Sequence, residues 1–510
     1  MNDRKPSGNS ILRCVFVALS LLFQVGWLLL LILKLNEYSG WISLITSVLA
    51  LLLVLRLYSK HTTSAMKTPW IMLILVFPVM GLSLYLMIVM FGDLGSDGRR
   101  LKKIQEQLQT FLPQPQSGQQ KLEQQEAVVA NQFRYLWKYT GNPVYADTAT
   151  EYYGNAVDAF EALKADLEKA RHFIFMEYFI VSDTSSFREI QEILVRKAKQ
   201  GVQVRLMYDD IGSVGYVNLS FAKKLNEQGI RCRVFNPAVP ILNVFLNHRD
   251  HRKITVIDGV VGFTGGFNLA DEYFDRAHPF GKWKDTGIRL EGSAVASLTA
   301  SFLEIWNSHA REPEDCSQYF VHQSTGKADG LVQPFGDNPL AQERVAENVY
   351  LNLINSAQKS LYMITPYLII TDEMNRALGL AARRGVDVRI VTPGIPDKKT
   401  VYAMTRSYYS GLVSQGVRIF EYTPGFCHAK QCLCDGILAS IGTSNLDYRS
   451  LYLHFENDVL LYDCKAVRQM AADFEELFPQ CREVTTQYQT GRGRFLRIWQ
   501  CVLRLFAPMM

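Results

Sequence analysis

The sequence carries few charged residues and almost no net charge. Of its 510 residues, 20% are Asp, Glu, Lys or Arg, and the formal net charge is only +5. Nucleic-acid-binding domains usually concentrate basic residues on one face, whereas Lys and Arg here are spread along the whole chain. We therefore expect no nucleic-acid partner. Hydrophobic residues make up 48% of the chain, which suits a folded core together with some membrane-embedded helix.

The chain also lacks a regular cysteine framework. Its nine cysteines are an odd number without framework spacing, so we expect reduced, structural thiols rather than a set of disulfides. Cys427, Cys432 and Cys434 form a cluster that could suggest a zinc site. No second pair of ligands at zinc-like spacing accompanies them. The sequence therefore predicts neither a metal nor another cofactor.

Long hydrophobic runs occur near the N-terminus. Segments 11–33, 41–55 and 70–91 are strongly apolar, and a membrane-crossing helix needs about 20 such residues. The pattern predicts a membrane anchor over residues 1–95 with two or three transmembrane helices, and hence a multi-pass protein. A signal peptide is disfavoured, because the first run is too long and no small-residue cleavage site follows it. The flanking charges do not decide which side of the membrane carries the rest of the chain.

After residue 95 the chain becomes polar and then repeats one order of elements. Residues 96–130 are Gln-rich and predict a linker or a loosely attached helix. The stretches 131–325 and 326–485 then each predict a strand, a helix and a strand, which is typical of α/β units with a parallel or mixed sheet. These elements are expected at 173–180, 187–199 and 201–208, and again at 361–370, 372–384 and 385–391.

The last segment, 486–510, is basic and amphipathic. Its apolar residues recur at helical spacing, with arginines opposite them. The apolar positions are Phe495, Ile498, Trp499, Val502 and Phe506. The pattern indicates a helix that lies either in a membrane interface or against the preceding domain.

The repeat also carries a chemical motif, H-x-K-x4-D. The first half has it once and the second half has it once, and each copy is followed by an Asn seventeen residues after the His. The residues are His251, Lys253, Asp258 and Asn268, and then His428, Lys430, Asp435 and Asn445. The two His are 177 residues apart, as are the two Asn. Chance is a poor explanation for two copies with the same internal spacing.

This motif pair resembles the signature of the phospholipase D superfamily. Further segments are similar to those of bacterial cardiolipin synthases, from about residue 41 to the C-terminus. They include 208–213 (YDDIGS), 283–286 (WKDT), 402–409 (YAMTRSYY), 422–426 (YTPGF) and 442–450 (GTSNLDYRS). The resemblance implies an α/β fold of two similar phospholipase D-like α/β/α halves with one active site between them. We expect N-terminal transmembrane helices to precede the halves, in a bacterial cell membrane.

The motif residues suit attack on a phosphodiester. On a strand, His and Lys two residues apart point to the same side, so each half presents an imidazole next to a cation. One His can form a covalent phosphoryl-enzyme while the other protonates the leaving alcohol and then deprotonates the incoming one. The two Lys, with Asn268 and Asn445, would hold the non-bridging oxygens. By resemblance to the superfamily, the nucleophile is His251 and the acid and base is His428.

Five carboxylates complete the predicted site. Asp258 and Asp435 have the opposite strand parity to the histidines, which indicates structural or orienting groups within the motif. Asp285 and Glu456 each stand just before an apolar strand and are candidates to orient the imidazoles. Glu177 lies on a buried strand, where a carboxylate needs a partner, and we expect it to contact the substrate.

The resemblance implies a phosphatidyltransferase that joins two phosphatidylglycerol molecules into cardiolipin and releases glycerol through a phosphatidyl-histidine intermediate. The expected partners are phosphatidylglycerol and the bilayer. A phospholipase D hydrolase or a phosphatidylserine synthase would use the same half-sites. A non-catalytic membrane scaffold is disfavoured, because both motifs are intact. The residues do not decide the acceptor alcohol or the oligomeric state.

Overall fold

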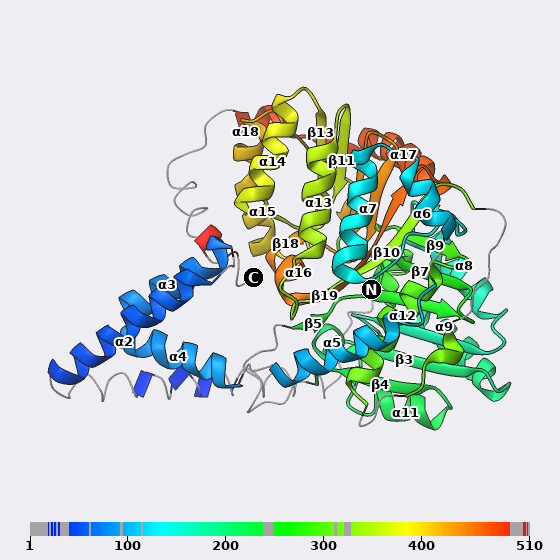
Figure 1. Cartoon of the computed structure of the whole chain (residues 1–510), viewed down its shortest axis with the longest axis horizontal. Helices are drawn as coiled ribbons and strands as arrows, with labels where there is room; N and C mark the ends of the chain where they lie inside the picture. Colours follow the sequence, from blue (N-terminus) through cyan, green and yellow to red (C-terminus); the bar gives the residue numbers. More distant parts are fainter. Residues whose placement is uncertain are drawn as a thin grey trace.

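The structure is a computed structural model of the whole chain. It describes residues 40–60, 63–91, 95–113, 116–237, 248–310, 314–320 and 328–489, together with isolated positions among 19–30 and at 503–505 and 507. Two α/β halves form the body of the molecule, and a group of N-terminal helices projects from it (Figure 1).

The first half is built on a seven-stranded sheet with the order β1-β9-β7-β6-β2-β3-β4. The pairs β2–β3 and β3–β4 are parallel and the others are antiparallel. The strands are β1 (Ala149–Tyr153), β2 (Phe173–Tyr178), β3 (Gln203–Asp209), β4 (Arg231–Phe235), β6 (Lys253–Ile257), β7 (Val261–Gly265) and β9 (Gly287–Glu291). The helices are α8 (Ala156–Leu167), α9 (Ser185–Lys199), α10 (Asp210–Ser213), α11 (Phe221–Glu227) and α12 (Val295–Ser308).

The second half repeats this plan in the order β10-β19-β17-β16-β11-β13-β14-β20. Again the strand–helix–strand unit is parallel, here β11–β13–β14. The strands are β10 (Leu331–Asp337), β11 (Ser360–Ile364), β13 (Asp387–Pro393), β14 (Arg418–Tyr422), β16 (Gln431–Cys434), β17 (Leu438–Gly442), β19 (His454–Tyr462) and β20 (Cys481–Glu483). The helices are α13 (Val345–Ser356), α14 (Asp372–Arg383), α15 (Lys399–Val413), α16 (Tyr448–Leu453), α17 (Lys465–Leu477) and α18 (Thr485–Gln489).

The predicted repeat is confirmed, with one difference at residues 361–370. The expected single strand is divided into β11 and a short strand β12 (Leu368–Ile369), which pairs with β18 (Leu446–Asp447). Pro366 lies between them and has no N–H to offer to a ladder. The coarse fold class, two α/β halves of similar plan, therefore holds.

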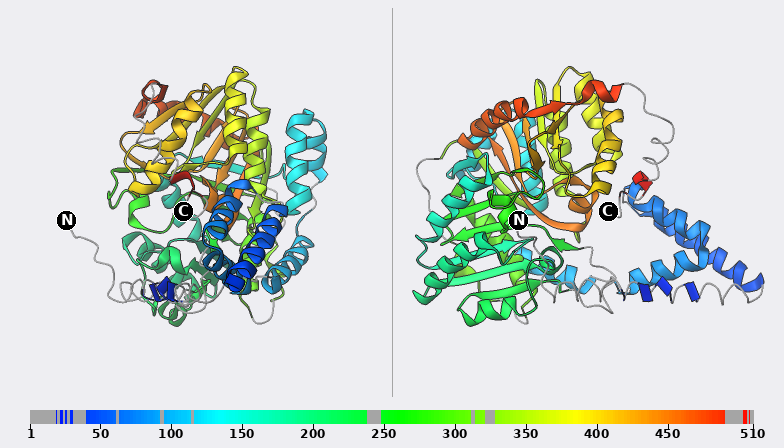
Figure 2. Two further views of the ribbon diagram at one scale, coloured as in Figure 1. Left: turned by 90° about the vertical axis from the view of Figure 1, so that its left-hand side faces the viewer. Right: turned by 180° about the vertical axis from the view of Figure 1, so that it is seen from behind.

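The halves are joined by exchanged short strands. Strand β5 (Arg249–Asp250) of the first half pairs in parallel with β19 of the second. Strand β8 (Lys282–Lys284) of the first half pairs with β15 (Gly425–Cys427) of the second. In the views of Figure 2 the two sheets lie against each other across this junction. Both motif histidines follow one of these strands directly, so the exchange brings the two half-sites to one place.

The N-terminal helices require a correction. Expected segment 70–91 is broken into two helices, α3 (Ser64–Val76) and α4 (Pro78–Phe91). They fold back on each other so closely that a Cβ on Gly81 would lie 2.6 Å from the Cα of Ile74. Pro78 stands at the bend, where its ring disfavours helical backbone at Phe77.

The prediction of a multi-pass protein of the bacterial cell membrane was wrong for the part of the chain that the structure covers. Among these residues, none of the helices has both the length and the apolar character that crossing a bilayer requires. Expected segment 41–55 lies within α2 (Gly40–Ser59), which packs with α3 and α4. Most of expected segment 11–33 lies outside the described residues.

For residues 96–130, expected as a linker or a loosely attached helix, the described part is mostly helical. It forms α5 (Gly95–Gln109) and α6 (Gln116–Glu123) and leads into α7 (Ala127–Thr140). Leu101, Ile104 and Leu108 are buried on α5, at a spacing that places them on one face of a helix. The Gln-rich composition hid this apolar stripe, which attaches α5 to α12 of the first half.

Of the predicted tail helix, Phe495, Ile498, Trp499, Val502 and Phe506 lie outside the described residues. The described part contacts α15: Arg504 Nε lies 3.2 Å from Ser407 Oγ, and the guanidinium stands over the ring of Tyr408 at 4.3 Å. Leu503 and Ala507 are buried. These contacts agree with the alternative of a tail that docks on the domain.

Candidate active site

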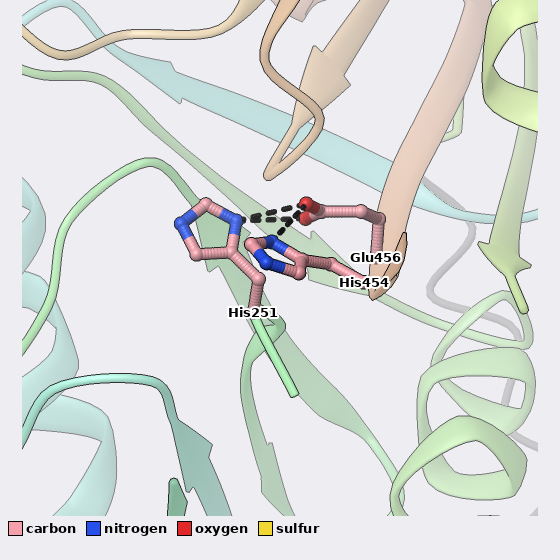
Figure 3. Close-up of side chains that lie close together, drawn as sticks. All are labelled: His251, His454 and Glu456. Carbon is pink, nitrogen blue, oxygen red and sulfur yellow. Dashed lines mark hydrogen bonds and ion pairs between the residues drawn. The ribbon is translucent and has the colours of Figure 1, made fainter. Parts of the chain in front are cut away.

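The first motif histidine lies between β5 and β6 and is oriented by the other half. Its backbone N–H donates to Phe455 O at 3.0 Å. The Nδ1 atom of His251 lies 2.9 and 3.0 Å from the two carboxylate oxygens of Glu456, which stands on β19 (Figure 3). Glu456 is fully buried and His251 nearly so. The carboxylate thus holds the ring by Nδ1 and leaves Nε2 for chemistry.

The second motif histidine repeats this arrangement with the halves reversed. His428 follows β15, and its backbone N–H donates to Lys284 O at 2.7 Å. Its Nδ1 atom lies 2.8 Å from Oδ2 of Asp285, which follows β8. Each half therefore supplies one imidazole and the carboxylate that orients the imidazole of the other half.

Burial keeps both imidazoles neutral. It lowers the pKa of His428 to about 4 and, despite the opposing charge of Glu456, lowers the pKa of His251 well below its usual value. Burial by itself would raise the pKa of Glu456, but its close interaction and hydrogen bond with His251 bring that pKa below the usual range. The pair therefore combines a neutral imidazole with an ionised carboxylate.

The motif lysines are buried next to the histidines. Burial lowers the pKa of Lys253 to about 8 and that of Lys430 to about 7. Lys430 Nζ lies 2.8 Å from Nδ1 of His428, and both lysines donate to the carbonyl oxygen of their own motif histidine. An anion placed between the half-sites would raise both pKa values, because it favours the charged amines.

The two motif asparagines both line the cavity described below. The amide of Asn268 is engaged, since its Oδ1 accepts from Ile180 N at 3.0 Å and its Nδ2 donates to Tyr273 Oη at 2.7 Å. Asn445 has a buried Oδ1 without a hydrogen-bond partner. The two halves therefore differ: hydrogen bonds hold both ends of the Asn268 side-chain amide, whereas the Oδ1 atom of Asn445 has no such bond.

The motif aspartates lie away from the cavity, in matching hairpin turns. Asp258 and Gly259 have φ values of 53° and 70°, and Asp435 and Gly436 have 52° and 70°. Asp-Gly with two positive φ values is the sequence preferred by two-residue hairpin turns. The Asp258 carboxylate accepts from three backbone N–H groups, those of Arg171, His172 and Phe173, at 2.7–2.8 Å. The Asp435 carboxylate accepts from Gln358, Lys359 and Ser360 in the same way, at 2.7–2.9 Å.

Glu177 does not reach the cavity. It is fully buried on β2, and its carboxylate forms an ion pair with Arg252 at 2.6 Å. Arg252 also binds Asp250 at 3.1 Å. The partner that a buried carboxylate needs is therefore a protein side chain, and the geometry does not support the expected contact with substrate.

The half-sites share one cavity of about 460 Å³. Side chains of both halves line it, including His251, His428, Arg249 and Arg449. Much of the remaining wall is aromatic, formed by Phe179, Tyr216, Tyr273, Phe280, Trp283, Tyr367 and Phe426. The cavity thus combines an apolar wall with nucleophilic and cationic groups.

Three further residues contact the Glu456 carboxylate or lie near it, and two of them, Ser450 and His454, were missed at the sequence level. Thr443 Oγ1 donates to Glu456 Oε2 at 2.5 Å, and Ser450 Oγ donates to Oε1 of the same carboxylate. His454, two residues before Glu456, places its Nδ1 3.7 Å from Oε1. Thr443 stands where the first half has Gly266, and this difference was the one available signal. A Cβ on Gly266 would lie 2.0 Å from Asp285 Oδ1, so a side chain is excluded there.

The cysteines offer a poor metal site. Burial raises the pKa of Cys427 and Cys432 well above the usual value and that of Cys434 to about 12, which disfavours the thiolate that binds metals. Among the described residues, the one group of three side chains with metal-binding spacing is His251, His454 and Glu456.

Comparison with protein families agrees with this geometry. The family model described as cardiolipin synthase, PLD-like domain, matches residues 163–306 and 350–478, one segment in each half. A second model, described as phospholipase D-nuclease N-terminal, matches residues 45–88. The two family segments together contain both motif histidines.

Individual relatives extend over nearly the whole chain. A cardiolipin synthase of Halalkalibacterium halodurans is 35% identical over 93% of this chain and 95% of its own length. An uncharacterized protein of Streptococcus mutans is 41% identical over 90% of this chain and 99% of its own. The phosphatidylserine synthase structure of Haemophilus influenzae has a TM-score of 0.56 at 14% identity, covering 74% of this chain and 97% of that one, and so shares the fold. The resemblance inferred from the motifs is confirmed, and the chain belongs to the cardiolipin synthase family with phospholipase D-like domains.

Proposed function

We propose that this protein is a cardiolipin synthase that transfers a phosphatidyl group from one phosphatidylglycerol molecule to another and releases glycerol. The observation that carries the proposal is the pair of crossed half-sites, in which each imidazole is oriented by a carboxylate of the other half at 2.8–2.9 Å. The cardiolipin synthases among the relatives support the choice of substrate.

In the first step, Nε2 of His251 attacks the phosphorus of the donor lipid. The bond between phosphorus and the glycerol oxygen breaks, and His428 gives its proton to the departing alkoxide. The product is a phosphatidyl-histidine. In the second step, a hydroxyl of the second phosphatidylglycerol loses its proton to His428 and attacks the phosphorus, and the bond to His251 breaks. Both histidines are then back in their starting states.

His428 must be protonated before the first step, although burial lowers its pKa to about 4 in the free enzyme. The anionic phosphate of the donor lipid supplies the compensation, since a nearby negative charge favours the imidazolium. Lys253 and Lys430 hold the non-bridging oxygens as charge develops on them. Asn445 would assist through its side-chain amide, whereas the amide of Asn268 is held by Ile180 and Tyr273. Glu177 has no part in this scheme.

Phospholipid substrates require access from a bilayer. The helix α2 presents exposed apolar side chains that suit contact with lipid: Leu44, Ile45, Val48, Leu49, Leu51, Leu52 and Leu55. The aromatic wall of the cavity suits the apolar part of a lipid near its headgroup. We therefore propose phosphatidylglycerol and the bilayer as the partners of the protein.

Product analysis tests the proposal. The full-length protein, purified in detergent, is supplied with phosphatidylglycerol labelled in the headgroup glycerol and in the acyl chains. We expect cardiolipin and free glycerol in equal amounts, and neither product from the His251→Ala variant. Phosphatidic acid as the main lipid product would identify a hydrolase instead. In a parallel reaction supplied with serine and CDP-diacylglycerol, formation of phosphatidylserine, with no cardiolipin from phosphatidylglycerol, would identify a phosphatidylserine synthase.

A further inference from the structure

His454 lines the cavity but has no task in the proposed mechanism. It is the first residue of β19, and its side chain is 10% exposed. Neither of its ring nitrogens has a hydrogen-bond partner. Figure 3 shows its ring beside that of His251, with both directed at the carboxylate of Glu456. The centroids of the two imidazoles are 5.5 Å apart.

The other half-site has no such imidazole. Trp283 stands two residues before Asp285, as His454 stands two residues before Glu456. The indole of Trp283 lies 5.7 Å from the ring of His428. An indole offers no lone pair to a metal, so the two half-sites differ in their capacity to bind a cation.

Two imidazoles and a carboxylate are ligands that zinc prefers in proteins. Ligands of a tetrahedral zinc ion with bonds of about 2.0–2.1 Å stand roughly 3.4 Å apart. The Nδ1 atoms of His251 and His454 lie 2.9 and 3.7 Å from oxygens of Glu456, and the ligand atoms of the three residues lie within 4.8 Å of one another. The two distances to Glu456 each lie within about half an ångström of this ligand spacing. His251 and His454 both line the cavity, through which an ion can enter.

We propose that His251, His454 and Glu456 bind one zinc ion and that the bound ion inhibits the enzyme. A metal on Nδ1 of His251 leaves the proton of the neutral imidazole on Nε2, so that Nε2 has no lone pair for attack on phosphorus. The ion also binds the Glu456 carboxylate, which then no longer orients the ring of His251. Lys253 is the nearby cation that opposes binding. The metal site itself is independent of the proposed function, while its inhibitory effect rests on it.

Cobalt(II) spectroscopy tests the site without any assay of activity. The full-length protein is treated with chelator, freed of it, and titrated with cobalt(II) chloride. We expect one equivalent to bind with the visible absorption of nitrogen and oxygen ligands, and zinc to displace it. The variant His454→Phe should weaken binding by at least about tenfold to a hundredfold, since even outer partners of metal ligands are worth that much.

A matched control is His248→Phe. His248 is a second histidine near the site, but its Nδ1 lies 3.2 Å from Leu453 O and it is not one of the three ligands. Cobalt binding should be unchanged in this variant. Should His454→Phe fail to fold, His454→Asn serves in its place, because it also removes the imidazole. Absence of binding in the unaltered protein, equal binding in the His454 variants, or a thiolate charge-transfer band from the cysteines would each overturn the proposal.

Inhibition is then measured as phosphatidyl transfer against free zinc, with each variant compared with its own rate in chelator. We expect zinc to stop the unaltered enzyme, chelator to restore it, and the His454 variant to need at least tenfold more zinc. Equal sensitivity of both proteins would overturn the inhibitory role. A protein that binds cobalt as expected but transfers no phosphatidyl group would instead contradict the proposed function.

Discussion

The aspartates of the two motifs stabilise turns, and removing one should affect the fold before it affects the chemistry. We consider Asp258→Ala. The Asp258 carboxylate accepts three backbone N–H groups that precede or begin β2, at 2.7, 2.7 and 2.8 Å. Asp258 also has a φ of 53°, which Ala adopts less readily than Asp. The loss of these hydrogen bonds and the strain of Ala at this φ both destabilise the folded state.

The stability lost in Asp258→Ala depends on how exposed the three backbone N–H donors are to water. Hydrogen bonds to a charged group contribute about 1.5–3 kcal/mol each, but Arg171 and His172 are exposed and their N–H groups can bind water instead. The N–H of buried Phe173 loses its Asp258 partner entirely. We therefore expect a loss of about 2–4 kcal/mol. For a half of this size the thermal midpoint should fall by about 4–16 °C, at about 2–4 °C per kcal/mol.

Thermal unfolding of the purified full-length protein measures this change, and transfer assayed well below the midpoint measures the chemistry. We expect the folded variant to keep its transfer rate within about tenfold. This limit corresponds to a change of about 1.4 kcal/mol in the activation free energy. Asp258→Asn, which keeps one acceptor oxygen, should lose about half as much stability. Asp435→Ala should behave like Asp258→Ala, because its contacts are the same. A variant with an unchanged midpoint and a rate reduced by about a thousandfold or more would show that the carboxylate acts in the chemistry instead.

Three further predictions concern the crossed half-sites. Either His251→Ala or His428→Ala should lower transfer by at least about a thousandfold, and labelled lipid should still accumulate on His251 in the His428 variant. Burial lowers the pKa of His428 to about 4, so between about pH 6.5 and pH 4 the unfolded chain holds a proton that the folded chain lacks. The thermal midpoint should therefore fall as the pH falls through this range, and a fall of the same size in His428→Phe would contradict this. Gly266→Ala should displace Asp285 and reduce transfer at least tenfold, whereas Gly411→Ala, with open space around it, should leave the rate unchanged.

The half-sites were predictable because their signal is local. The motif occurs twice with the same spacing to Asn268 and Asn445. The expectation that His and Lys share one strand was wrong, because His251 lies between β5 and β6, and His428 and Lys430 lie between β15 and β16. The sequence predicted Asp258 and Asp435 to be structural or orienting groups. The hairpin turns in which they lie were not foreseen. The N-terminal segments were misread, because hydropathy does not show that Pro78 and Gly81 allow 70–91 to fold back on itself.

The sequence by itself determined the residue types, their periodicity and the duplication of the motif, since these depend on neighbours along the chain. Only the tertiary structure decided which carboxylate serves which histidine: β5 and β8 cross to the other half, so Glu456 orients His251 and Asp285 orients His428. It also paired Glu177 with Arg252 and placed His454 beside His251. These contacts join residues distant in the chain or on different strands, and their geometry is set by the packing of two sheets, which no local pattern records.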